Sequence, residues 1–297
     1  MGKKEGYLQQ CYERAQYQEA LDGYLALANS NLNPDERAEL DYRIGQCYYK
    51  KGNFNKAQIF FSQALQNSGT QELTSRCYNE LGTIFYKERR VEQAIELTNK
   101  AMSLVKPGTL DASAIYNNLG RIYYQKQEYS KALYYFRMSM VIKEQNLPMD
   151  DLEMSVSYNN IGLVYMEMGD YEQALRYLEI SLSIRKKYLD SFHPDIGTTY
   201  NNIARIYMQM KQYDNAKSTF DKALKIRIKV LGEKHLDTAM TYYGLALVYW
   251  QLGEYKKAQR MYEHVYHILS ETDTLDNKDM MYVLDAIKSN WEVQVMK

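Results

Sequence analysis

Paired asparagines recur at regular intervals through the middle of the chain. Asn is a poor residue for a helix interior, because its side-chain amide competes for backbone hydrogen bonds. The amide also carries a donor and an acceptor together, which matches the two polar groups of a peptide bond. These residues therefore predict contact with an extended peptide, with hydrogen bonding between neighbouring repeats as the alternative. The members are Asn117 and Asn118, Asn159 and Asn160, Asn201 and Asn202, and a single Asn79 in an earlier position.

Apolar and basic side chains follow the asparagines at helical spacing. A row of aromatic and thioether side chains is suited to the apolar side chains of a ligand, and packing between neighbouring helices is the alternative. Arg121 and Arg205 follow the asparagines more closely and could bind acidic residues of a ligand by paired hydrogen bonds. A solvated face neutralised by nearby Glu explains the arginines equally well. The row consists of Tyr49, Tyr86, Tyr124, Met166, Met208 and Trp250.

Catalytic and metal-binding patterns are missing from the sequence. It contains no glycine-rich phosphate loop and no nucleophile elbow. His193 and His235 stand 42 residues apart, so they read as one structural residue in successive loops rather than as metal ligands. Three cysteines lack metal or redox spacing and are interpreted as reduced thiols. We expect no enzymatic activity, no metal and no cofactor.

The elements that position these residues are pairs of helices. A small residue marks the first helix of each pair, and an alanine follows twelve residues later on the second helix. The small residues are separated by 37, 38, 42, 42 and 42 residues, and a weaker copy around Tyr17, Ala20 and Tyr24 precedes them. The sequence thus predicts seven helix pairs. The small residues and their alanines are Gly45 with Ala57, Gly82 with Ala94, Gly120 with Ala132, Gly162 with Ala174, Ala204 with Ala216, and Ala246 with Ala258.

This pattern resembles the tetratricopeptide repeat, a helix-turn-helix unit. The later copies, with Phe192-His193-Pro194-Asp195 before one first helix, are similar to the 42-residue repeats of kinesin light chains and nephrocystin-3. The resemblance implies an all-α, right-handed superhelical solenoid whose first helices line a concave groove. It also implies that the second asparagine of each pair, at Asn118, Asn160 and Asn202, hydrogen-bonds the backbone of a peptide.

The predicted organisation is a single repeat domain over residues 1–297. Asn33 is expected to cap a helix that has Pro34 in its first turn. Asp111, Asp195 and Asp237 each stand nine residues before the small residue of their helix and are expected to cap later first helices. A final helix over residues 278–296 is expected to cover the open end of the stack. The predicted repeats span approximately residues 4–30, 35–67, 72–105, 111–145, 153–189, 195–231 and 237–270.

Composition narrows the class of protein. The 297 residues include 37 basic and 37 acidic side chains, and 45% are hydrophobic, which is enough for a large core. The balanced charge and the absence of a basic run speak against nucleic-acid binding. No segment reaches the roughly 18 apolar residues of a membrane span, and the N-terminus lacks a signal core. We expect a cytoplasmic protein, and the sequence leaves its oligomeric state open.

Together these features predict a non-enzymatic scaffold for protein–protein interaction. An extended peptide segment of a partner, with acidic and apolar residues, would lie in the concave groove. Two other functions remain open at this point: a regulatory sensor that responds to peptides, and the cargo- or partner-binding portion of a larger motor adaptor or enzyme. Function inferred by analogy of fold alone does not decide among them.

Overall fold

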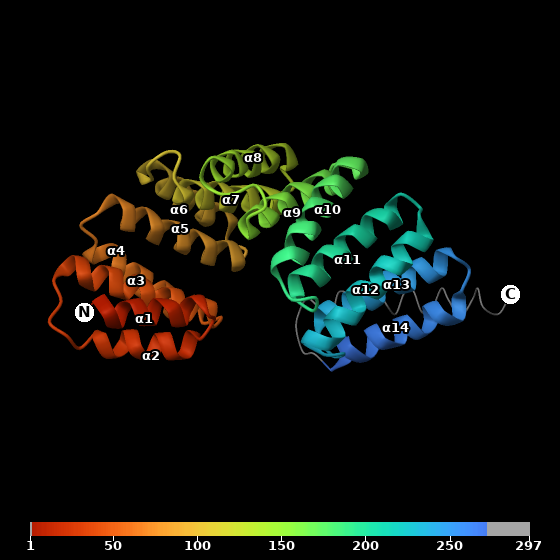
Figure 1. The fold of residues 1–297 in the computed structure, drawn as a ribbon, viewed down its shortest axis with the longest axis horizontal. Helices are drawn as coiled ribbons and strands as arrows, with labels where there is room; N and C mark the ends of the chain where they lie inside the picture. The colour runs from red at the N-terminus through yellow and green to blue at the C-terminus, as the bar shows by residue number, and fades with distance from the viewer. Residues whose placement is uncertain (1, 272–297) are drawn as a thin grey trace. The chain divides into compact units, whose positions relative to one another are not determined.

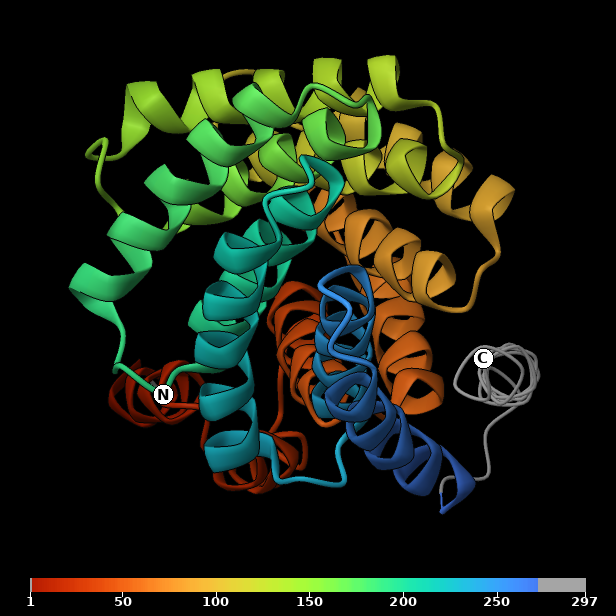
Figure 2. The same ribbon diagram turned by 90° about the vertical axis from the view of Figure 1, so that its right-hand side faces the viewer.

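The computed structural model describes residues 2–271, so the predicted helix over 278–296 lies outside the described residues. Within this range the elements are fourteen helices, and no strand occurs among them. Consecutive helices form antiparallel pairs joined by short turns (Figure 1), and Figure 2 shows the same pairs from the side. The all-helical fold of successive helix pairs predicted from the repeat is confirmed over the described residues.

The chain divides into two compact units, with the boundary between Leu147 and Pro148. Unit one contains the first four helix pairs. Two buried clusters join the first pair to the second and the second to the third, with Phe61 and Ile44 among the largest fully buried side chains. The helices are α1 (Gly2–Glu13), α2 (Tyr17–Leu27), α3 (Pro34–Lys50), α4 (Phe54–Asn67), α5 (Gln71–Lys87), α6 (Val91–Leu104), α7 (Leu110–Gln125) and α8 (Tyr129–Asn146).

Unit two contains three helix pairs. The fully buried Leu178, Ile206 and Phe220 belong to clusters that each span two successive pairs. The helices are α9 (Leu152–Glu167), α10 (Tyr171–Tyr188), α11 (Pro194–Gln209), α12 (Tyr213–Leu231), α13 (Leu236–Gln251) and α14 (Tyr255–Ser270).

Small residues allow the two helices of a pair to approach closely. A Cβ atom added at Gly120 on α7 would lie 2.6 Å from the ring of Phe136 on α8, a distance that side chains do not tolerate. At Gly162 on α9 the added atom would lie 3.2 Å from the backbone oxygen of Ala174 on α10, and Ala174 itself is fully buried. The predicted small positions therefore lie at the contact between paired helices.

Helix caps differ in part from the prediction. Asn33 caps α3 as expected: its side chain accepts a hydrogen bond from the backbone amide of Glu36, and the Glu36 carboxylate accepts one from the backbone amide of Asn33. The predicted aspartate caps are wrong, because α7, α11 and α13 begin two residues earlier in the chain than expected.

The residues that cap these helices are a threonine and two histidines. Thr109 caps α7, while the Nδ1 atoms of His193 and His235 accept hydrogen bonds from the backbone amides two residues on, at 3.2 and 3.1 Å. The aspartates Asp111, Asp195 and Asp237 instead lie in the first turn, where a carboxylate is stabilised by the helix dipole.

In unit two, buried arginines connect each second helix to the pair that follows. Arg227 on α12 is only 5% exposed, and its Nη1 donates to the backbone oxygen of Asp237 at 2.6 Å and to Oγ1 of Thr241 at 2.7 Å, both on α13. Its equivalent Arg185 on α10 makes the same two bonds to α11, at 3.0 and 2.6 Å. Burial lowers the pKa of both guanidinium groups, and the first-turn aspartates partly oppose this shift.

Overpacking the contact between α9 and α10 should destabilise the fold. Ala174→Phe adds a ring where the neighbouring backbone leaves no room, so we expect the free energy of unfolding to fall by about 1 to 3 kcal/mol. Urea denaturation followed by circular dichroism measures this. Arg176→Phe adds the same ring at an exposed position of the same helix and is the control. If Ala174→Phe and wild type unfold at the same urea concentration, the packing described is contradicted.

Removing an arginine that joins two pairs should also destabilise unit two. Arg227→Met keeps most of the apolar volume but leaves buried oxygen atoms on α13 without their donor, which should cost about 1 to 3 kcal/mol. Thermal and urea denaturation measure the loss. Arg260→Met, at an exposed position of α14, should change the midpoint far less. If both variants unfold at the same midpoint, the buried hydrogen bonds of Arg227 make no net contribution to the free energy of unfolding.

Candidate functional site

The exposed sides of the first helices form the candidate surface. We call the exposed sides of α5 and α7 the first-helix surface of unit one, and those of α9, α11 and α13 the first-helix surface of unit two. The position two residues before Gly120, Gly162 and Ala204 carries the amide that the repeat resemblance assigns to peptide binding. Each unit is described separately.

In unit one the asparagines bond to each other. The Nδ2 of Asn118 on α7 donates to Oδ1 of Asn79 at 2.8 Å and to Oγ1 of Thr83 at 2.9 Å, both on α5. These two bonds use both hydrogens of the amide, so Asn118 holds neighbouring repeats together, as the alternative interpretation of the asparagines predicts. Asn117 is half-buried beside it.

In unit two the first asparagine of each pair points inward. Asn159 and Asn201 are 8% and 9% exposed. The Oδ1 atom of Asn201 accepts hydrogen bonds from Arg227 and Thr241, both at 3.3 Å, so it belongs to the buried arginine cluster. The Oδ1 atom of Asn159 is buried and has no hydrogen-bond partner among the described residues. The second asparagines differ from each other: Asn160 is half-buried, whereas Asn202 is 7% exposed and is as buried as Asn201.

The aromatic and thioether row is less exposed than the sequence pattern indicates. Met166 is buried rather than exposed, because it packs with Ile203 and Ile206 of α11 and with the second helix of its own pair. The other five members are half-buried. Three of them pack against the first residue of the second helix in their own pair, with centroid distances of 4.9 to 5.8 Å: Tyr49 with Phe54, Tyr124 with Tyr129, and Trp250 with Tyr255.

The two predicted arginines have different surroundings. In unit one the guanidinium carbon of Arg121 lies 4.8 Å from the ring centroid of Tyr86, so a member of the aromatic row already binds this cation. In unit two the side chain of Arg205 is 49% exposed, and its ion pair with Glu167 is long, at 3.9 Å. A long, exposed pair of this kind contributes little to stability, which leaves Arg205 available to a ligand carboxylate.

Two charged residues that sequence reasoning missed occupy the asparagine position on α3 and α5 of unit one. Glu80 on α5 and Arg43 on α3 stand two residues before their small residues, where α7 carries Asn118. Burial raises the pKa of Glu80, and its carboxylate lies 3.5 Å from the hydroxyl of Tyr42. Counting two residues back from each small residue would have found both side chains. The polar row of unit one thus changes from charged to amide along the stack.

The thiols match the interpretation made from their spacing. Cys11, Cys47 and Cys77 are free and buried. Burial raises the pKa of Cys47 to about 11 and that of Cys77 to about 12, which disfavours the reactive thiolate. Over residues 2–271 there is no group of three or more His, Cys, Asp or Glu side chains that could hold a metal ion. No helix in this described range combines the length and the hydropathy needed to cross a membrane.

Comparison with known proteins agrees with this geometry. Family models described as tetratricopeptide repeat match residues 36–106, 113–148, 153–207 and 195–271. Response regulator aspartate phosphatase E of Bacillus subtilis (strain 168) is 31% identical over 87 residues. That match covers 29% of this chain and 23% of the relative, so the chain spans less than a quarter of the curated protein it matches.

Solved structures show the same fold at low sequence identity. The apo form of RapI superposes with a TM-score of 0.69 and 19% identity, covering 99% of this chain and 84% of RapI. A putative kinesin light chain from Podosopora anserina, with nearly identical TPR-like repeats, superposes with a TM-score of 0.56 and 23% identity over 66% of this chain and 94% of its own. The predicted similarity to kinesin light chain repeats is confirmed, and the chain belongs to the tetratricopeptide repeat family.

Proposed function

We propose that the chain binds an extended segment of a protein partner on the first-helix surface of unit two. The tetratricopeptide fold is a scaffold for protein–protein interaction, and we infer that this chain acts in that way without catalysing a reaction. The observation that carries the proposal is the exposed, weakly paired Arg205 on α11, with the half-buried Met208 one turn further along the same helix. A cation next to apolar surface favours a segment that carries both acidic and apolar residues.

The apolar part of the proposed site extends across two neighbouring first helices. Met208 on α11 packs against the cluster that contains Leu245 and Val248 of α13. Trp250 occupies the equivalent position on α13 and contacts Tyr255 edge-on at 4.9 Å. An indole held in this way presents a rigid apolar face. Little side-chain entropy is lost when a ligand packs against it, because the ring is already ordered.

The amides have an orienting role in this proposal. Asn160 and Asn202 stand at equivalent positions on α9 and α11, and an extended peptide could bond to one amide per repeat. Because Asn202 is 7% exposed in the unbound chain, its contribution requires the ligand backbone to lie close against α11. Unit one is the weaker candidate, since Asn118 is bonded to Asn79 and Arg121 lies over Tyr86.

Substitutions on this surface provide the test. A library of random peptides is screened against the wild-type chain, and binders are measured by fluorescence anisotropy. Reversing the charge in Arg205→Glu should weaken acidic binders at least tenfold, because a favourable charge pair becomes repulsive. The double variant Asn160→Ala with Asn202→Ala should weaken acidic and neutral binders alike, because both depend on the amides.

Arg260→Glu makes the same charge change at an exposed position of α14 and is the matched control. All variants are first checked for wild-type helicity and for a single species in solution. Binders that are retained by both surface variants, or lost equally in Arg260→Glu, would show that the first-helix surface of unit two is not the binding site.

A second candidate function rests on the curated relative. The 31% identity to response regulator aspartate phosphatase E favours a chain that binds a phosphorylated response regulator and promotes loss of its phosphate. The direct test incubates the chain with a panel of phosphorylated response regulators and follows the acyl phosphate with time. Faster loss of the acyl phosphate than in buffer would support this function. If the half-life of the acyl phosphate is unchanged for every response regulator in the panel, this second function is rejected and the scaffold proposal stands.

A further inference from the structure

A pocket of about 250 Å³ lies on unit two, where the loop after α10 meets α11 and α12. Its floor is apolar and its rim is basic. The floor is formed by Phe192, Ile196, Tyr200 and Ile226, and the rim carries Lys186, Lys222 and Lys225, with Ser191 beside them. This volume accommodates one large apolar side chain of a ligand, not a whole folded element.

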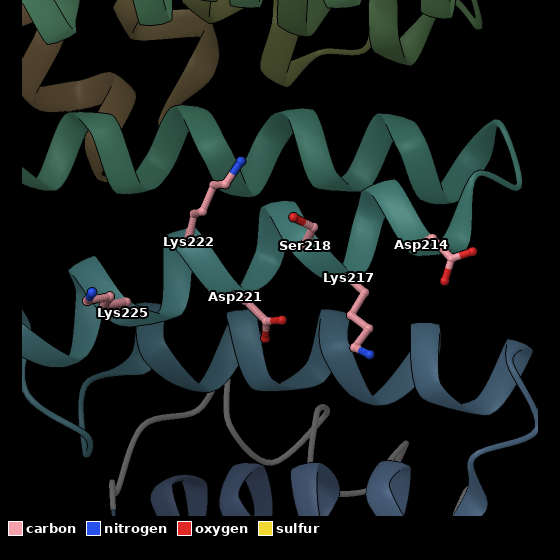
Figure 3. A pocket seen from close by; sticks show the side chains of 6 residues that line it. All are labelled: Asp214, Lys217, Ser218, Asp221, Lys222 and Lys225. Atoms are coloured by element: carbon pink, nitrogen blue, oxygen red, sulfur yellow. The ribbon is translucent and has the colours of Figure 1, made fainter.

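The rim lysines are exposed and lack acidic partners. Among the described residues none of the three forms an ion pair with a carboxylate. Figure 3 is a close-up of a neighbouring pocket that shares Lys222 and Lys225, and it shows that Lys222 projects from α12 toward α11, whereas the adjacent Asp221 projects to the other side of the helix. The ammonium group of Lys222 lies 5.8 Å from the ring centroid of Tyr200, at the edge of the apolar floor. The pocket therefore combines apolar surface with positive charge that no carboxylate of the described chain neutralises.

A further lysine fixes one wall of the pocket. The ammonium nitrogen of Lys229 on α12 lies 3.4 Å from the ring centroid of Phe192. This cation–π contact holds the ring of the α10–α11 loop against α12 and adds a fourth positive charge near the rim. An aromatic ring held in this way is a preorganised wall, so a ligand need not order the loop when it binds.

Comparison with the equivalent positions in the neighbouring repeats separates the pocket residues that are needed for packing of the repeat from those that are not. The floor residues Tyr200 and Ile226 have the same residue type 42 positions earlier, at Tyr158 and Ile184, so they belong to the repeat core. The charged residues and the loop ring do not follow the repeat. In place of Phe192, Lys222 and Lys225, the preceding repeat has Asp150, Ile180 and Ser183, and the following repeat has Lys234, His264 and His267.

We propose that this pocket is a second docking site, which binds an acidic segment of a partner protein by inserting one apolar side chain between the rim lysines. Carboxylates on either side of the inserted residue would pair with Lys186 on α10 and with Lys222 and Lys225 on α12. The site does not depend on the function proposed above. Tyr200 and Asn202 are two residues apart on α11, which places them on nearly opposite sides of the helix.

Peptide titration tests the proposal with the full chain. The probe is a fluorescent peptide with a central tryptophan flanked by aspartates, and a second peptide has serine in place of the tryptophan. We expect the tryptophan peptide to bind wild type at least tenfold more tightly than the serine peptide. The double variant Lys222→Glu with Lys225→Glu should weaken the tryptophan peptide at least tenfold.

Matched variants separate this site from general charge effects and from the first-helix surface. Lys106→Glu with Lys256→Glu makes the same charge change at two exposed lysines outside the pocket and should retain binding. Arg205→Glu should also retain it. Equal weakening by the two double variants, equal binding of the two peptides, or loss of binding in Arg205→Glu would each overturn the proposal.

Anionic lipid vesicles are a further arm of the same experiment. If the pocket variant loses binding to phosphatidylserine vesicles while its affinity for the tryptophan peptide stays at the wild-type value, the lysines form a membrane contact and the docking proposal is wrong. Retained peptide selectivity in wild type, with no vesicle binding, supports it. Circular dichroism and the melting midpoint of each variant confirm that the fold is intact before affinities are compared.

Discussion

The close approach of paired helices is the constraint on which the rest of this structure depends. At Gly120 and Gly162 the neighbouring side chain or backbone occupies the space that a Cβ atom would need. Because the glycine has no Cβ atom, a side chain of the paired helix fills the space, as the ring of Phe136 does at Gly120. The buried clusters that join one pair to the next are a consequence of that geometry.

The polar residues of unit two follow from the same arrangement. Once a second helix extends past the contact, its last turns reach the start of the next first helix, and a long side chain there can bond to exposed backbone oxygens. Arg185 and Arg227 do this, and Thr199 and Thr241 complete the hydrogen bonds. A buried guanidinium surrounded by neutral oxygens is tolerated because its N–H groups donate to those oxygens. The buried oxygens, in turn, need hydrogen-bond donors.

The fold was predictable from the sequence because the same spacing of small and large residues recurs in each repeat, and each copy predicts the same packing of two helices. What the pattern could not give was the direction of individual side chains. Met166 is buried although the equivalent residues are half-buried, and Asn118 is bonded to Asn79, since the surroundings of both are set by the neighbouring repeat. The histidine caps were missed because Asp195 and Asp237, better capping residues, stand two positions later.

The buried arginines also determine how tightly neighbouring repeats are coupled. In unit two they tie α10 to α11 and α12 to α13, whereas the equivalent positions of the second and third pairs, Ser68 and Val105, fall just after α4 and α6 have ended. In a linear array each repeat is stabilised only by its neighbours, so the strength of these junctions decides how many repeats open together. The pairs of unit two should therefore open as one cooperative block, with uniform protection from hydrogen exchange, while α3–α4 and α5–α6 exchange more independently of one another.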